Sequence, residues 1–224
     1  GPGPPRPRGG VRVSSPPHTS EEYWRGVGRL EDLPDLELTR ADGSPAEHLL
    51  VVVAHPDDET LAVGGLIHDG GLRGLRTTIL VATDGRASHP HSPTHAPDDL
   101  SRIRRRELAA AVALLDPESE CRVLGLEDGL LSARVETLTR EISDHCDAGT
   151  IIVSTWRHDG HPDHEAVGRA AASAAAAMGC RHLEAPIWAW AWTTDRDVPW
   201  RIASRHWCSP GALRQKAEAI AAYR

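Results

Sequence analysis

Four short runs of apolar and β-branched residues recur along the chain, and polar residues follow each of them. The runs cover residues 49–54, 77–83, 121–126 and 150–155. Continuous apolar runs of this length are typical of strands that are buried on both faces of a parallel sheet. We expect one more strand over residues 187–192, where large and small side chains alternate.

Helical patterns fill most of the segments between these runs. Apolar residues recur at a helical period, or alanine is enriched, in several of them. Helices are therefore expected over residues 60–68, 101–115, 135–145, 165–178 and 211–223. Because strands alternate with helices, the fold class is α/β, with a mostly parallel sheet that helices cover on both faces.

The first 20 residues differ from the rest of the chain in composition. Pro, Gly, Arg and Ser dominate residues 1–20, and such a segment buries too little apolar surface to offset its chain entropy. We expect a disordered tail there and a single folded domain over residues 21–224. Within that domain, residues 21–48 are expected to wrap onto the core as a short helix and an irregular strand.

Charge and hydropathy exclude several classes of protein. The formal net charge is −7 and the pI is near 6.0, which argues against a nucleic-acid-binding protein. No apolar run approaches the roughly 20 residues that cross a bilayer, and no signal peptide is recognisable. The four cysteines lie far apart and form no Cys-x-x-Cys pair, so we expect mostly buried free thiols in a cytoplasmic protein. The oligomeric state is left open.

Two of the predicted strands end in clusters of imidazoles and carboxylates. The first strand runs directly into His55, Asp57 and Asp58, and the strand over 150–155 is followed by Asp159, His161, Asp163 and His164. Ligand crevices of open α/β sheets lie beyond the carboxyl ends of strands. Carboxylates packed together there repel one another unless a cation or a proton compensates them. Imidazole nitrogen and carboxylate oxygen are ligands that zinc takes, so the two clusters predict a metal site.

Other polar and aromatic groups have simpler interpretations. The Pro-, Ser- and His-rich segment 87–98 is long for a connection and predicts a binding loop. A second metal site formed by its His89, His91 and His95 is the other interpretation, and we favour the loop. We interpret the arginines of the helix over 101–115 as a solvated face, with Arg104 bridging to Glu107. The tryptophans of residues 187–192 are expected to pack in the core, or to stack on a ligand ring at the rim of a pocket.

The motifs His55-Pro56-Asp57-Asp58-Glu59 and His161-Pro162-Asp163-His164 resemble those of the LmbE-like, or PIG-L, family of zinc-dependent N-acetylglucosaminyl deacetylases. The resemblance runs from about residue 49 to the end of the chain, with softer matches between the two motifs. It implies a Rossmann-like fold and removal of the N-acetyl group from an amino sugar or sugar conjugate, by attack of a metal-bound water.

The same resemblance implies roles for individual residues. It makes His55, Asp58 and His164 the ligands of a Zn²⁺ ion, with another divalent ion such as Fe²⁺ as the alternative. It makes Asp57 the general base. His161 would stabilise the oxyanion and protonate the leaving amine, with Asp163 adjusting the charge of His161.

Two further residues are candidates for substrate binding. Many members of the family have Glu where this chain has Arg86, and a guanidinium recognises carboxylate or phosphate well. Asp159 either lines the pocket or makes a turn with Gly160. The expected partner is a small amino-sugar conjugate whose aglycone the sequence does not specify.

Three other functions compete with a deacetylase. An amidase acting on a bulkier N-acyl sugar conjugate would use the same site, and a sugar-binding domain could keep the fold without turnover. The two-histidine, one-carboxylate site of non-haem Fe(II) oxygenases also fits part of the pattern. We set it aside because those proteins are jelly rolls, whereas strands alternate with helices here.

Overall fold

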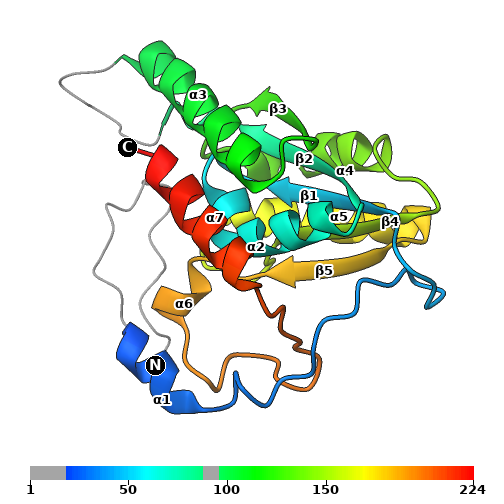
Figure 1. Ribbon diagram of the computed structural model, residues 1–224. Coiled ribbons are helices and arrows are strands. Elements are labelled where there is room, and N and C mark those ends of the chain that lie inside the picture. Colours follow the sequence, from blue (N-terminus) through cyan, green and yellow to red (C-terminus); the bar gives the residue numbers. More distant parts are fainter. Residues whose placement is uncertain (1–18, 88–95) are drawn as a thin grey trace, which may run out of the picture.

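A five-stranded, all-parallel sheet forms the centre of the protein (Figure 1). The structure, a computed structural model, describes residues 19–87 and 96–224. The strands are β1 (His48–Val53), β2 (Arg76–Thr83), β3 (Glu120–Leu126), β4 (Thr150–Thr155) and β5 (Arg181–Ala185). They lie in the order β3-β2-β1-β4-β5, so β1 occupies the middle of the sheet. The predicted α/β class and the four strands predicted from apolar runs are confirmed.

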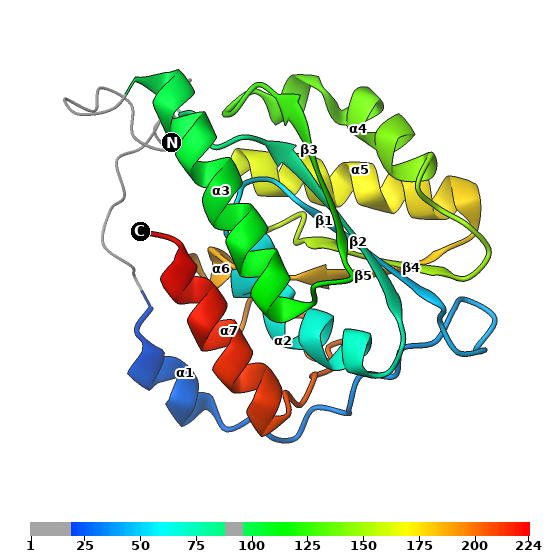
Figure 2. The same cartoon turned by 45° about the horizontal axis from the view of Figure 1, so that its top comes forward.

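Helices cover both faces of this sheet (Figure 2). One face carries α2 (Asp58–Leu72), α3 (Pro97–Leu115) and α7 (Pro210–Ala222). The other carries η1 (Leu131–Ala133), α4 (Val135–Ser143) and α5 (Pro162–Met178). Two short helices, α1 (Glu21–Val27) and α6 (Ala189–Trp192), lie beside each other at one end. The five predicted helices are all present.

Strand β1 shows why the sheet is covered on both sides. Leu49, Val51 and Val53 point into the core beneath α2 and α3, whereas Leu50 and Val52 point into the core beneath α5. All five side chains are buried. Since successive side chains of a strand point to opposite faces, a continuous apolar run is what this position requires.

The strand predicted over residues 187–192 is wrong, because residues 189–192 form α6 and residues 187–188 form a turn. The N–H groups of Ile187, Trp188 and Ala189 all donate to the carboxylate of Asp159. A buried carboxylate 28 or more residues away therefore holds the turn, which local alternation cannot reveal. The true fifth strand, Arg181–Ala185, was missed because its polar, half-buried edge sequence lacks an apolar run.

The start of the described chain qualifies the prediction of a disordered tail. The tail predicted over residues 1–20 lies, up to residue 18, outside the described residues. Thr19 donates a hydrogen bond to the Thr193 carbonyl and Ser20 caps α1, so both are part of the folded unit.

The four cysteines are free thiols, but Cys121 is exposed and the others are partly exposed, so their predicted burial is wrong. Among the described residues, no helix has the length and apolarity to cross a membrane.

Stability should depend on pH through His48, which lies at the start of β1 and is almost completely buried. Its ring nitrogens pair with the hydroxyls of Thr150 and Thr78, each at 2.9 Å. Burial, assisted by Arg76, lowers the pKa of His48 to about 4. The unfolded chain takes up a proton near pH 6.5, before the folded chain does, so stability falls as the pH drops from about 6.5 to 4.

We expect this loss to reach about 3 kcal/mol. Urea unfolding of the wild type and of His48→Gln, which cannot titrate, measures it as the difference between the two pH profiles. Parallel profiles between pH 7 and 4 would show that His48 remains accessible to protons in the folded state.

Candidate metal centre

The two polar clusters lie side by side at the carboxyl edge of the sheet. His55, Asp57 and Asp58 follow β1, whereas His161, Asp163 and His164 stand at the start of α5, after β4. Strands β1 and β4 are parallel neighbours. The chain passes from β1 to β2 on one side and returns to β4 on the other, so the clusters meet at the topological switch point of the sheet.

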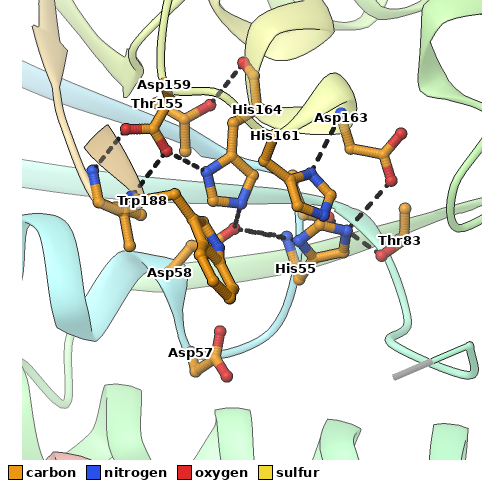
Figure 3. A network of polar contacts seen from close by, with 12 residues as sticks. His55, Asp57, Asp58, Thr83, Thr155, Asp159, His161, Asp163, His164 and Trp188 are labelled. Atoms are coloured by element: carbon orange, nitrogen blue, oxygen red, sulfur yellow. Dashed lines mark hydrogen bonds and ion pairs between the residues drawn. The ribbon is translucent and has the colours of Figure 1, made fainter. Parts of the chain in front are cut away.

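Asp58 and His164 lie together in the interior of the site, and both are buried (Figure 3). Asp58 Oδ2 lies 3.2 Å from His164 Nε2 and 3.5 Å from His55 Nδ1. His164 Nδ1 lies 2.6 Å from Asp159, which is fully buried behind it. A proton on Nδ1 would be donated to Asp159, which leaves the Nε2 lone pair facing the Asp58 carboxylate. This Nε2 atom is buried and has no hydrogen-bond partner within the described part of the chain.

His55 is oriented from its far side by two carboxylates. Its Nε2 atom lies 3.1 Å from Asp163 and 3.2 Å from Asp128. Asp163 is held in turn by the backbone N–H groups of Gly129 and Leu131. A proton on Nε2 is thus bound by these carboxylates, and Nδ1 is left to face Asp58.

The charges of the site call for a cation. Burial disfavours protonation of His164, yet Asp58 and Asp159 outweigh it and raise its pKa to about 9. Burial also opposes protonation of His55, but Asp128, Asp163 and Asp58 raise its pKa well above the usual value. A metal ion and these protons compete for the same nitrogen lone pairs. The His and carboxylate donors fit zinc, and His55, His161 and His164 place one ligand atom each within 4.8 Å of one another.

Asp57 is strained and sits apart from the buried pair. Its φ is +107°, and it is the one non-glycine residue in 19–87 and 96–224 with positive φ. Such backbone costs about 1–3 kcal/mol and is concentrated at functional sites. Burial and the neighbouring Asp58 raise the pKa of Asp57 to about 7, against the opposing charge of Arg104, whose guanidinium lies 3.0 Å away.

His161 caps the N-terminus of α5. Its Nδ1 atom accepts the backbone N–H of Asp163 at 3.2 Å, so the neutral ring carries its proton on Nε2. Burial, together with the nearby His164 and His55, lowers the pKa of His161 to about 4. The Asp163 carboxylate touches His55 and acts on His161 only through space.

The two residues expected at the substrate are both engaged within the protein. Arg86 pairs with Asp84 through two hydrogen bonds, and about half of its side chain remains exposed. Its contact with a substrate stays a prediction. Asp159 binds His164 and three backbone N–H groups and has no exposed surface, so the structure makes it a support for His164 and α6. The second metal site considered at His89, His91 and His95 lies outside the described residues.

Three residues of the site escaped the sequence analysis. Arg104 is not on a solvated face: besides Glu107 it contacts Asp57, and it lies over the ring of Tyr223. Tyr223 donates to Glu59, a buried acid in the first turn of α2. Asp128 follows β3, and the strand-end rule applied to that strand would have found it. Nothing in the sequence signals the contacts of Arg104 and Tyr223, which depend on how α3 and α7 pack against α2.

Known proteins resemble this chain in sequence. The model of the family PIG-L, described as GlcNAc-PI de-N-acetylase, matches residues 50–175. A probable N-acetyl-α-D-glucosaminyl L-malate deacetylase 2 of Bacillus subtilis (strain 168) is 33% identical over 130 residues, which are 55% of this chain and 58% of that protein. A 1D-myo-inositol 2-acetamido-2-deoxy-α-D-glucopyranoside deacetylase of Rhodococcus opacus (strain B4) is 27% identical over 191 residues, 71% of this chain and 60% of the relative. The chain thus spans less than two thirds of either relative.

Solved structures agree on the fold. A triple mutant of a deacetylase from the teicoplanin biosynthetic pathway has a TM-score of 0.63 at 25% identity and covers 79% of this chain and 81% of its own. The N,N′-diacetylchitobiose deacetylase of Pyrococcus horikoshii has a TM-score of 0.60 at 19% identity, over 80% and 70% of the two chains. The family model matches both motifs and more than half of this chain. The chain therefore belongs to the PIG-L family of LmbE-like N-acetylglucosaminyl deacetylases.

Proposed function

We propose that this protein is a zinc-dependent hydrolase that removes the N-acetyl group from a conjugate of N-acetylglucosamine. His55, Asp58 and His164 would hold the metal. The observation that carries the proposal is the buried, unpartnered Nε2 atom of His164, which faces the Asp58 carboxylate at 3.2 Å. Two acceptors held face to face in the interior repel each other unless a proton or a cation compensates them, and a metal ion bound here would take that role.

The reaction breaks the amide C–N bond, forms a C–O bond to water, and releases acetate and an amine. A bound divalent ion supplies acidification of water and polarisation of the amide carbonyl. Asp57 is the general base that accepts the water's proton, because it lies beside the proposed ligands and is not committed to them. A positioned base of this kind contributes roughly 10²–10⁴-fold to the rate.

His161 acts on the other side of the reacting carbonyl. Because its Nδ1 accepts a backbone N–H, its Nε2–H is free to donate to the carbonyl oxygen as negative charge develops there. The proton taken by Asp57 is then available to the leaving amine, directly or through His161. Asp163 holds His55 and tempers the charge around His161.

The relatives support an amino-sugar substrate, since the two named above act on N-acetylglucosamine joined to malate and to myo-inositol. Zinc is supported by the donor set, in which imidazole nitrogens and a carboxylate oxygen lie together. An amidase for a bulkier acyl group would use the same residues, so the acyl group must be tested by experiment.

Removal of the metal should abolish turnover. The purified protein would be assayed for acetate release from a panel of N-acetylglucosamine conjugates before chelation, after chelation and after zinc is restored, with metal content measured at each stage. We expect near-stoichiometric zinc and a chelation-sensitive, zinc-restored activity. Bound zinc without acetate release, but with release of longer acids from N-acyl analogues, would favour the amidase. Turnover that survives complete removal of metal would overturn the mechanism.

A further inference from the structure

Three aromatic rings stand in a row from the candidate metal centre outward. The rings of His161 and Trp188 are stacked, with centroids 6.2 Å apart and planes 29° apart. Trp188 and Trp192 are stacked in turn, at 6.1 Å and 18°. Figure 3 shows Trp188 beside His161 and in front of Asp58. We call Trp188 and Trp192 the indole platform.

The platform is attached rigidly to the metal centre. Asp159 binds His164 Nδ1 at 2.6 Å and, at 2.8–3.0 Å, the three backbone N–H groups that start α6. Trp192 packs against the turn at Gly160, where its Cδ1 atom is 3.4 Å from the place a Cβ would occupy. On the opposite side of α6, Trp24 donates to the Trp190 carbonyl and packs edge-on against its ring. One buried carboxylate therefore sets the position of both the His164 ring and the platform.

Core packing does not account for Trp188. Trp188 is 38% exposed, although Asp58 and His164 nearby are buried. Its indole N–H donates to no acceptor within residues 19–87 and 96–224, whereas the N–H groups of Trp24 and Trp190 both do. An exposed indole face whose N–H group is not engaged by the protein can stack on a ring that has an apolar face, and it can donate to a hydroxyl group at the edge of that ring.

We propose that the indole platform is the subsite for the aglycone of the substrate, and that it selects a sugar or cyclitol ring over an acyclic diacid. This inference rests on the proposed function, which places the N-acetyl group beside His161. When the amide of the substrate lies beside His161, its aglycone extends along the stacked rings of Trp188 and Trp192. A malate aglycone offers no ring face for the platform, and it would bring carboxylates to indoles that cannot neutralise them.

The test compares three substrates on the zinc-loaded protein. They are N-acetylglucosamine joined to myo-inositol, to malate and to methyl. We expect kcat/KM to be highest for the inositol conjugate. Trp188→Ala should lower kcat/KM for this conjugate about 3- to 10-fold more than for the methyl glycoside, mainly through KM. Trp188→Phe, which keeps a flat ring, should recover most of that difference.

Trp190→Ala is the matched control, because Trp190 lies on the same short helix, is 37% exposed and faces away from the metal centre. It should leave the ratio between the inositol and methyl substrates unchanged. A preference for the malate conjugate, or an equal loss on all substrates in Trp188→Ala, would overturn the proposal.

Binding separates a failure of this inference from a failure of the proposed function. Calorimetric titration of the same proteins with uncleaved inositol conjugate needs no turnover. If no conjugate releases acetate, the proposed function fails, yet tighter binding to the wild type and Trp188→Phe than to Trp188→Ala still supports the platform. Equal binding to all variants contradicts the platform whatever the activity.

Discussion

Asp57→Asn should keep its metal and lose roughly 10²–10⁴-fold in kcat. The substitution removes the proton acceptor but leaves the neighbouring Asp58, His55 and His164 in place. Asn tolerates positive φ nearly as well as Asp does, so the +107° backbone survives. Arg104 keeps Glu107 as a partner at 3.3 Å, which limits the disturbance on the α3 side. Steady-state acetate release and metal content, measured on one preparation, check both halves of the prediction.

Asp69→Asn is a control with the opposite expected phenotype. Asp69 is a buried carboxylate of α2, and its hydrogen bonds are to His206 and to Ser209, the N-cap of α7, rather than to residues of the metal centre. We expect it to lower the free energy of unfolding by about 1–3 kcal/mol and to leave kcat nearly unchanged. If Asp57→Asn instead lost its metal, Asp57 would be a ligand and another group would have to serve as the base.

The sequence predicted the parts of this protein that depend on local pattern. Strands such as residues 49–54 and 150–155 are buried on both faces of the sheet. Consecutive residues must therefore be mostly apolar, and this pattern is recognisable in the sequence. The strand-end rule then brought His55 and His164 together, since parallel neighbouring strands end at one edge. The site predicted from two motifs more than 100 residues apart is compact because β1 and β4 are adjacent.

Features that depend on tertiary packing could not be predicted from local pattern. Arg104 reads as solvated on a helical wheel, and only the approach of α3 to α2 turns it toward Asp57. The tryptophans of residues 187–192 alternate as in a strand, but Asp159 binds three consecutive N–H groups and closes a turn. Edge strand β5 is half-buried and polar, so its sequence lacks the signal that identified the other four. For Arg104 and for residues 187–192, a side chain distant in the sequence overrode the local preference.

Asp159→Asn should weaken zinc binding by about 10- to 100-fold, the usual cost of losing a carboxylate behind a metal-binding His. All four partners of Asp159 are donors: His164 Nδ1–H and the N–H groups of Ile187, Trp188 and Ala189. A carboxylate can accept from all of them. An amide replaces one oxygen with an NH₂ group, which must face at least one of these donors and leave it unpaired in the interior. His164 would then lose the contact that sets its tautomer and aims Nε2 at Asp58.

Zinc affinity would be measured by competition with a chelator, and Glu165→Gln provides the matched control. Glu165 lies one residue beyond His164, but it is partly exposed and contacts Gly160 and Arg169. We expect no change in its zinc affinity. Asp159 also anchors α6, so a second effect is expected in Asp159→Asn. When both proteins are saturated with zinc, the variant should bind the inositol conjugate more weakly than the wild type. Unchanged zinc affinity in Asp159→Asn would mean that His164 is held by the rest of α5, and that its unpartnered Nε2 atom is not aimed by the carboxylate behind it.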